Sequence, residues 1–460
     1  MMRYKGTLIL LILVILLGLY LYIIELPSQE KKQQEEDRIQ KIVSFEPNEA
    51  ISLYLSYPKR LTDQEILLEK DSEDKWQIVK PITFPADQPE VESLLSSIGS
   101  MKVERVVEEK AQDLKAYGLD QPEIKVSVKL KDREEHLLFG DAAPVGSTIY
   151  VVKSGEDTVR LTDQFYKTHL TKTVMDLRKK EILNLDPQLV TQFILQYPGQ
   201  TFVLAKENGQ WWIKKPRMFR ADDEVVSDML GFLRRLRATV FVDQASSKLL
   251  KAFHHPRIKV EIESENGATT TLSIYEVPGS SSDGQKTYAV TNTPNPIYLI
   301  EAMAVTDLEK DLFTLSDKHL LAFDPDQVQM VEIRKASDEP LTIHREGDGW
   351  NFEGQTLEEN QKQKITDLLK DLSGLKADKM VEETPIAENP YGLNPPQFRI
   401  NLINSQQNKL AELLIGSKKD DLVYARSGSS EDIYMIKSHI LQDLPQKSDL
   451  KKQTVSRSTP

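Results

Sequence analysis

The stretches WQIVKPITFPAD, residues 76–87, and WWIKKPRMFRAD, residues 211–222, decide the fold of this chain. Both read Trp-x-Ile-x-Lys-Pro and end in Ala-Asp, and they begin 135 residues apart. A further tryptophan, Trp350, lies 139 residues beyond Trp211. Recurrence at a nearly constant, domain-sized spacing is typical of a repeated folding unit. We therefore interpret the stretch as one corner of a unit that the chain contains three times.

A helix is predicted after each tryptophan, because apolar residues recur at offsets of 19, 22 and 25, and three-residue steps mark one helix face. Asp87 and Asp222 precede the first two helices and are interpreted as N-caps, and Asp87 with Glu90 has the form of a capping box. The third copy has Gln361 at the same offset. The apolar trios are Leu95, Ile98 and Met101; Leu230, Leu233 and Leu236; and Leu369, Leu372 and Leu375.

Other markers recur in the same order. Each copy opens with an aromatic or leucine, an acid and a proline, at Pro47, Pro187 and Pro325. Tyr-Gly-Leu follows the tryptophan by 41 residues in the first and third copies, whereas the middle copy has Phe253-His254-His255-Pro256 instead. The structural repeat markers are Trp76, Trp211, Trp350, Asp87, Asp222, Tyr117, Gly118, Tyr391 and Gly392.

Strict alternation of apolar residues after Tyr-Gly-Leu predicts strands with one buried face. The predicted order is two strands, a helix, four strands and a second helix. Short turns between the strands favour antiparallel sheets with packed helices, an α+β fold in three tandem repeats. The predicted boundaries are 43–183 for repeat unit 1, 184–321 for repeat unit 2, 322–445 for repeat unit 3 and 446–460 for a polar C-terminal tail.

The N-terminus predicts a membrane anchor. Residues 7–24 contain no charge, and 18 helical residues span roughly 27 Å, close to the thickness of a bilayer core. Arg3 and Lys5 precede this run and favour a cytoplasmic N-terminus. We expect residues 1–6 in the cytoplasm, a transmembrane helix at 7–26 and a charged spacer at 27–42. A cleaved signal peptide is the alternative, although no small-x-small cleavage pattern follows the run.

Composition excludes several functions. The formal net charge of −12 argues against nucleic acid as a partner, because phosphate binding needs clustered Lys and Arg. The chain has no cysteine, which excludes disulfides, thiol catalysis and cysteine-bound metals. None of the seven histidines has the spacing of a metal-binding motif, and the adjacent pair His254 and His255 would point to opposite faces of a strand. We therefore predict no cofactor, no metal site, no catalytic residues and no enzymatic activity.

Trp212 is the one candidate ligand-binding residue. Its neighbour Trp211 takes the inward position of the predicted strand, so alternation turns Trp212 outward. Asp87 and Asp222 invite comparison with paired catalytic carboxylates, but the missing aspartate in the third copy favours helix capping.

The ordered set of motifs resembles a bacterial family catalogued as domain of unknown function 4340. These motifs are Trp-x-Ile-x-x-Pro, the Leu-Leu-x-x-Ile helix face, Tyr-Gly-Leu-x-x-Pro, and a strand ending in Phe-Gly or Ile-Gly. The resemblance covers roughly residues 43 to 445. It implies a single-anchor protein of the bacterial envelope. Together with the orientation favoured by Arg3 and Lys5, we expect a single-pass protein of the inner membrane, with its N-terminus inside and its bulk on the periplasmic or cell-surface side. The resemblance also implies a possible partner among ABC transporter permease or auxiliary subunits, as in gliding-motility-type transporters, and it supplies no catalytic residues.

The sequence thus predicts a non-enzymatic structural or interaction protein, bound to membrane lipid through its N-terminal helix and accessory to an ABC-type transporter or envelope complex. The alternative is a module that binds cell-wall glycan or another envelope polymer through exposed aromatic side chains such as Trp212.

Overall fold

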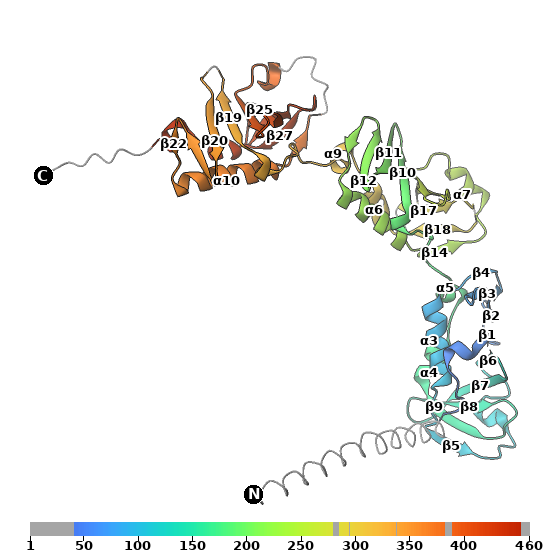
Figure 1. Ribbon diagram of the computed structural model, residues 1–460. Coiled ribbons are helices and arrows are strands. Elements are labelled where there is room, and N and C mark those ends of the chain that lie inside the picture. The colour runs from blue at the N-terminus through green and yellow to red at the C-terminus, as the bar shows by residue number, and fades with distance from the viewer. Residues whose placement is uncertain (1–40, 279–284, 294, 337, 382–388, 452–460) are drawn as a thin grey trace, which may run out of the picture. The chain divides into compact units, whose positions relative to one another are not determined.

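The computed structural model describes residues 41–278, 285–293, 295–336, 338–381 and 389–451. Within these residues the chain forms three antiparallel sheets of nine strands each, one for every predicted repeat (Figure 1). The long helix of each repeat packs on one face of its sheet. The fold is therefore mostly β with some helices, in three tandem repeats.

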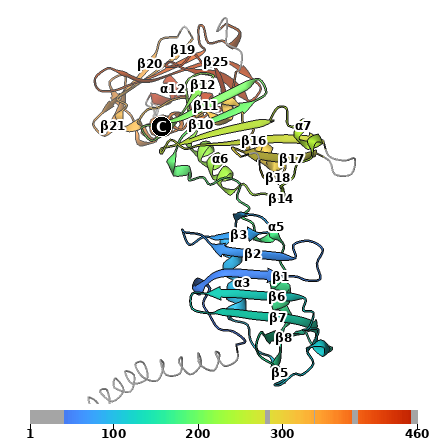
Figure 2. The same cartoon turned by 90° about the vertical axis from the view of Figure 1, so that its right-hand side faces the viewer.

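The first sheet has the strand order β4-β3-β2-β1-β6-β7-β8-β9-β5. Figure 2 shows β3, β2, β1, β6 and β7 side by side. The elements are β1 (Ala50–Ser56), β2 (Glu65–Lys70), β3 (Trp76–Lys80), β4 (Phe84–Pro85), α3 (Gln88–Gly99), β5 (Arg105–Glu108), the 3-10 turn η3 (Leu114–Tyr117), β6 (Ile124–Leu130), β7 (Glu134–Ala142), β8 (Thr148–Lys153), β9 (Val159–Asp163), α4 (Gln164–Leu170) and α5 (Val174–Leu177).

The second sheet repeats this order as β13-β12-β11-β10-β15-β16-β17-β18-β14. Its elements are β10 (Val190–Tyr197), β11 (Gln200–Glu207), β12 (Gln210–Lys215), β13 (Phe219–Arg220), α6 (Asp223–Arg235), β14 (Val240–Val242), α7 (Ser247–Ala252), β15 (Ile258–Ser264), β16 (Thr269–Pro278), β17 (Gln285–Thr291), β18 (Ile297–Ile300), α8 (Met303–Leu308) and α9 (Leu312–Leu315).

The third sheet has the order β22-β21-β20-β19-β24-β25-β26-β27-β23. Its elements are β19 (Met330–Lys335), β20 (Leu341–Glu346), β21 (Gly349–Phe352), β22 (Gln355–Thr356), α10 (Glu359–Ser373), β23 (Lys379–Met380), η6 (Asn389–Tyr391), β24 (Phe398–Ile403), β25 (Lys409–Lys419), β26 (Leu422–Ser427), β27 (Tyr434–Lys437), α11 (Ile440–Asp443) and α12 (Lys447–Leu450).

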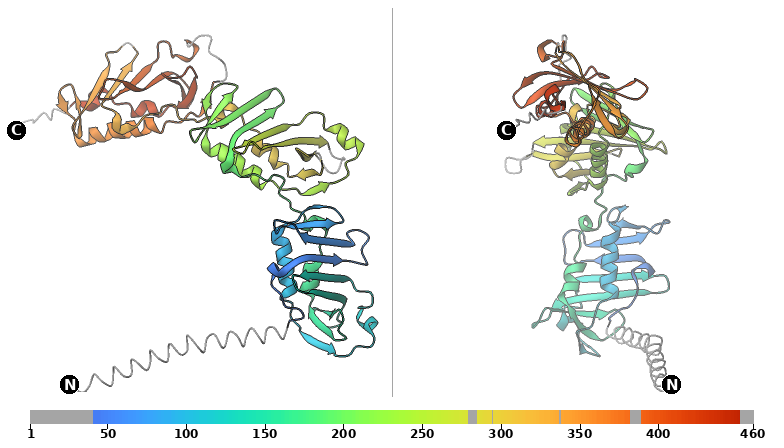
Figure 3. Two further views of the ribbon diagram at one scale, coloured as in Figure 1. Left: turned by 45° about the vertical axis from the view of Figure 1, so that its right-hand side comes forward. Right: turned by 60° about the vertical axis from the view of Figure 1, so that its left-hand side comes forward.

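The main core of each repeat lies between its sheet and its long helix. Figure 3 shows α3 running across the strands of the first sheet. Trp76, Trp211 and Trp350 are all buried, which confirms that the recurring tryptophan is a core residue. The predicted helix face is also confirmed, because the first two residues of every apolar trio lie on the helix and are buried. The third residue of each trio comes just after the helix ends.

The predicted count of six strands per repeat was wrong. Four strands precede the long helix rather than two, and one further strand follows it before the final four. The additional strands include β4, β13 and β22, each two residues long, and the edge strands β5, β14 and β23. Such short segments contain too few residues for a period of two to be recognised.

The helix starts differ among the repeats. Asp87 accepts a hydrogen bond from Glu90 N–H at 3.3 Å, and Asp222 accepts from Glu224 N–H at 3.1 Å, so both are N-caps as predicted. The side chain of Glu90 does not complete a capping box, because it forms an ion pair with Lys172 at 2.6 Å. In the third repeat the helix begins earlier, and Gln361 accepts from Glu358 N–H at 2.9 Å.

Residue contacts divide the chain into two compact units, 1–182 with 237–241, and 183–236 with 242–460. Residues 446–451, predicted as part of the tail, instead belong to the third repeat, since they form α12 and bury Leu450. The predicted transmembrane helix at 7–26 lies outside the described residues. No helix in the described part of the chain is long and apolar enough to cross a membrane.

Candidate functional site

Trp212 lies where alternation predicts it. Trp211 and Ile213 are buried, whereas Trp212 is half-buried on the opposite face of β12, between Ala205 of β11 and Arg220 of β13. The ammonium of Lys214, two residues along the same face, is 5.9 Å from the centroid of the Trp212 ring. An aromatic ring on this face is therefore accessible from one side.

The Tyr-Gly-Leu turn packs against the face of the sheet opposite the long helix. Tyr117 contacts Tyr150 of β8 with ring centroids 4.9 Å apart, and Tyr391 contacts Tyr424 in the same way at 4.9 Å. Gly118 has a left-handed φ of 67°, which favours glycine. Gly140 of β7 and Gly416 of β25 are needed for close approach, because a Cβ there would overlap the carbonyl oxygen of Tyr117 or Tyr391. These markers are structural.

The middle repeat replaces this turn with a different aromatic cluster. Tyr275 stands at the position that Gly140 holds in the first repeat, and Phe253 stacks on it with centroids 4.6 Å apart. Phe253 also contacts Tyr288, the counterpart of Tyr150, at 5.7 Å. The exchange of a glycine for a tyrosine thus accompanies the loss of Tyr-Gly-Leu. His254 and His255 lie exposed in a bend between α7 and β15, not on a strand as predicted.

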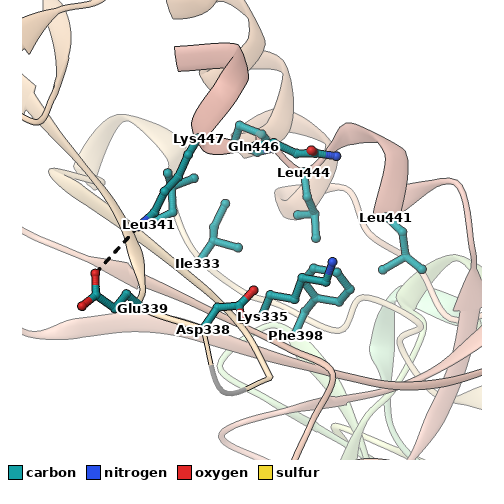
Figure 4. Close-up of a pocket in the computed structure, with 11 residues that line it drawn as sticks. Ile333, Lys335, Asp338, Glu339, Leu341, Phe398, Leu441, Leu444, Gln446 and Lys447 are labelled. Carbon is teal, nitrogen blue, oxygen red and sulfur yellow. Dashed lines mark ion pairs between the residues drawn. The ribbon is translucent and has the colours of Figure 1, made fainter. Parts of the chain in front are cut away.

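The third repeat contains a cavity of about 420 Å³ between β19, β20, the start of β24 and the segment from α11 to α12 (Figure 4). Its floor is apolar, and charged side chains from the β19–β20 turn and from α12 stand at its rim. The lining residues are Ile333, Lys335, Asp338, Glu339, Leu341, Phe398, Leu441, Leu444, Pro445, Gln446 and Lys447. This volume lies within the range of about 300–1,000 Å³ that is typical of ligand sites.

The cavity coincides with a substitution among the repeats. Counting ten residues from the opening prolines Pro47 and Pro187 leads to Tyr57 and Tyr197, whereas the same count from Pro325 leads to Lys335. In each repeat this position is the last of an alternating series that faces the core. The third repeat has a lysine at this position, where the other two have a tyrosine. We interpret this exchange as the origin of the cavity.

The two tyrosines are held in the same way. Tyr57 Oη donates to the carbonyl oxygen of Leu170 at 2.7 Å and accepts from Lys172 N–H at 3.1 Å. Tyr197 Oη donates to the carbonyl oxygen of Leu308 at 2.6 Å and accepts from a backbone N–H two residues later, at 3.2 Å. Burial raises the pKa of Tyr57 and of Tyr197 to about 12 in each case. Each ring therefore closes the end of its core and ties a strand to the last helices of the repeat.

The third repeat is slightly more exposed at the corresponding place. Leu444 follows Tyr424 by 20 residues, as Leu170 follows Tyr150 and Leu308 follows Tyr288. The side chains around the tyrosine position are wholly buried in the first two repeats, but Ile333 and Leu341 are each 5% exposed and Leu444 is 6% exposed. Their counterparts at 0% exposure are Leu55, Ile66 and Leu170 in the first repeat and Leu195, Phe202 and Leu308 in the second.

Charges of both signs surround the opening. Lys447 Nζ lies 4.0 Å from a carboxylate oxygen of Glu339 across the cavity, as the dashed line in Figure 4 shows. Lys335 is exposed, and its ammonium lies 6.0 Å from the centroid of the Phe398 ring. An exposed pair at such a distance contributes little to stability. The rim can therefore rearrange around an incoming group at small cost.

One protein family matches most of this chain. The family described as Domain of unknown function (DUF4340) matches residues 76–253, 211–365 and 357–455, which together cover most of the sequence in three tandem copies. The chain belongs to the DUF4340 family. The first two matches begin at Trp76 and Trp211. No curated protein and no solved structure matches the chain.

The DUF4340 copies also differ at a position that the sequence motifs do not include. The sequence shows the Tyr57, Tyr197 and Lys335 series once the opening prolines are aligned, but the series belongs to no catalytic or metal-binding motif. The side chains of Asp87 and Asp222, by contrast, each accept a hydrogen bond from a backbone N–H at the start of a helix. Across the residues that the structure describes, no group of three or more His, Asp or Glu side chains is placed to hold a metal ion.

Proposed function

We propose that this DUF4340 protein is a membrane-anchored, extracytoplasmic interaction protein without enzymatic activity. It serves as an accessory of an ABC-type transporter or a similar envelope complex in the inner membrane. The observation that carries the proposal is the cavity of the third repeat, formed where one copy of a shared fold has lost a core side chain. A preformed, partly apolar hollow with a charged rim is suited to recognition of a partner.

The N-terminal sequence supports the membrane part of the proposal. Residues 7–24 carry no charge, and Arg3 and Lys5 precede them. These features favour a single-pass anchor in lipid with the folded repeats on the outer side. A chain that lacks residues 1–26 should lose its association with the membrane while keeping the folded repeats.

Crosslinking in the native membrane tests the transporter part. A tagged full-length chain, crosslinked before solubilisation, should recover ABC transporter permease or auxiliary subunits. The chain that lacks residues 1–26 serves as the matched control and should recover fewer of them, because it is no longer held at the membrane. Failure to recover any transporter subunit, under conditions that preserve a known transporter complex, would contradict this part.

A second candidate function, binding of cell-wall glycan or another envelope polymer, is favoured by Trp212. Its ring is half-buried, and the ammonium of Lys214 lies 5.9 Å from its centroid. Aromatic faces of this kind stack on apolar surfaces of ligands. Sedimentation of the protein with purified wall material should then fall at least fivefold in Trp212→Ala. Phe165→Ala, which removes a 60% exposed ring from the first repeat, is the control and should leave sedimentation unchanged.

A further inference from the structure

The first two repeats show which side chain the cavity of the third repeat is shaped for. In the second repeat the ring of Tyr197 packs edge-to-face on Phe202, with centroids 6.0 Å apart, and its hydroxyl bonds to the carbonyl oxygen of Leu308. The strand register places Leu341 at the position of Phe202. Phe202 pairs with the residue two positions before Tyr197, and Leu341 pairs with the residue two positions before Lys335. Leu444 stands at the position of Leu308. Leu341 and Leu444 both line the cavity.

Lys335 does not fill the space that a tyrosine would fill. Its side chain is exposed, and its ammonium lies 6.0 Å from the Phe398 ring centroid at the edge of the cavity. Figure 4 shows Ile333, Leu341 and Leu444 converging on the hollow. Apolar walls left open to water are a source of binding free energy, about 25 cal/mol for each Å² that an incoming group covers.

The size and charge of the cavity indicate a side chain that belongs to a polypeptide. A volume of about 420 Å³ holds more than one phenol ring, so residues that flank the ring also fit. The rim presents Lys335 and Lys447 beside Asp338 and Glu339, which suits the mixed polar groups of a peptide better than a ligand of one charge sign. Tyrosine is also among the residues that most often anchor protein interfaces.

We propose that this cavity binds a tyrosine side chain of a partner polypeptide, with the ring on Ile333 and Leu341 and the phenol hydroxyl donating to the carbonyl oxygen of Leu444. The inserted ring takes the place that Tyr57 and Tyr197 occupy in their own repeats. The proposal rests on the proposed interaction function and names the chemistry of the contact. The chain's own tail, residues 452–460, is not the occupant, because it contains no aromatic residue.

The first experiment uses p-cresol, the side-chain analogue of tyrosine, with the full-length chain labelled at Ile and Leu methyl groups. Titration should shift the methyl NMR signals of Ile333, Leu341 and Leu444, with a dissociation constant on the order of 1 mM. The matching signals of Leu55 and Leu195 should not move. Toluene should bind about fivefold more weakly, the factor for one net hydrogen bond. Absence of shifts at the three cavity methyls would overturn the proposal.

Two substitutions at neighbouring positions sharpen the test. Lys335→Tyr restores the ring found in the other repeats, so p-cresol should no longer shift the cavity methyls. Arg334→Tyr places the same ring on the opposite face of β19, where Arg334 is exposed, and should leave p-cresol binding as in the wild type. Unchanged binding in a folded Lys335→Tyr variant would show that p-cresol occupies another site, and would overturn the proposal.

The reverse substitution keeps the proposal falsifiable if Lys335→Tyr does not fold. Tyr197→Gly should open a second cavity, so that p-cresol shifts the methyl signals of Leu195 and raises the melting temperature of this variant. Tyr197→Phe, which keeps the ring, is the control and should gain no site. If p-cresol does not bind to a folded Tyr197→Gly chain, the space left by this tyrosine does not accept a free phenol, and the proposal is contradicted.

A peptide comparison separates a polypeptide partner from a free phenol. Acetyl-Gly-Tyr-Gly-amide should shift the cavity methyls at several-fold lower concentration than p-cresol, and acetyl-Gly-Phe-Gly-amide should bind more weakly. Binding of p-cresol without binding of the tyrosine peptide would overturn the assignment to a polypeptide. The NMR binding experiments do not involve a transporter. They can therefore succeed when the crosslinking experiment fails, and they can fail when it succeeds.

Discussion

At the scale of single residues, Tyr57 and Tyr197 each connect two distant parts of their own repeat. Tyr57 in the first repeat is 2% exposed, and its hydroxyl bonds to a carbonyl oxygen 113 residues along the chain. Burial raises its pKa to about 12, against about 10 for an exposed tyrosine. The stabilising contribution is therefore fully present below pH 10 and is lost as the pH rises towards 12, because the unfolded chain ionises first.

Tyr57→Phe should show this dependence. At pH 7 the variant should lose about 1 kcal/mol of unfolding free energy, the value of one hydrogen bond. Between pH 10 and pH 12 the wild type should lose about 1.4 kcal/mol per pH unit from this residue, and the variant should not. Urea unfolding followed by methyl NMR signals of the first core measures both curves. Parallel curves for the two proteins above pH 10 would contradict the explanation.

The tyrosine series also shows what sequence analysis could not predict. The tryptophans were recognisable because a rare residue recurs at a constant spacing. Tyr57 ends an alternating series and looks like any apolar strand residue, and its partner Leu170 lies far away in sequence. Its role depends on a contact between the first strand and the last helices, which no local pattern contains. The cavity around Lys335 was therefore missed, although the substitution itself is visible in the sequence.

At the scale of elements, the helix starts were predictable because capping is local. Asp87 and Asp222 act on N–H groups two or three residues away, so their spacing is read directly from the sequence. The shortest strands were not predictable, because β4, β13 and β22 exist only through pairing with a neighbour. The earlier start of α10 was also missed, since the third repeat has no aspartate at the expected place and caps with a glutamate and a glutamine.

Substitution of the capping aspartates should weaken the first two repeats. Asp87→Ala and Asp222→Ala should each cost about 1 kcal/mol of unfolding free energy in the repeat that contains them. Asp87→Ser and Asp222→Ser keep an acceptor oxygen and should recover most of the loss. Hydrogen exchange of amides in α3 and α6 measures the effect. An alanine variant with the exchange rates of the wild type would show that the cap is not stabilising.

The Tyr-Gly-Leu turn supplies a second test at this scale. Gly140→Ala would place a methyl group against the carbonyl oxygen of Tyr117, and overpacking of this kind costs about 1–3 kcal/mol. The tyrosine pair Tyr117 and Tyr150 should separate, which NMR contacts between the rings would report. Gly155→Ala is the control, because a Cβ there meets open space and only the left-handed φ of 86° is strained. Equal costs for both variants would refute the close-approach explanation.

At the scale of the whole molecule, three copies of one fold differ in what they leave open to a partner. The first and third repeats share the Tyr-Gly-Leu turn, the first and second share the tyrosine at positions 57 and 197, and the second has its own aromatic cluster around Phe253. The second repeat therefore lacks the turn that the other two share, and the third lacks the tyrosine that the other two share, whereas the first repeat has both. Features that all repeats share are explained by the common fold. We therefore expect the function to depend on the features in which the repeats differ.

The proposed orientation of the chain can be measured directly, because the sequence contains no cysteine. Single cysteines at exposed positions in each repeat, Ser96→Cys, Lys206→Cys and Lys419→Cys, should react with a membrane-impermeant maleimide on intact cells from which any outer layer has been removed. Lys5→Cys should react only after the membrane is opened, because the cations ahead of the apolar run favour the cytoplasmic side. Detergent-treated cells are the control in which all four variants should react. Labelling of Lys5→Cys before that treatment, with protection of the other three, would mean that the repeats face the cytoplasm and that the proposed envelope partner is wrong.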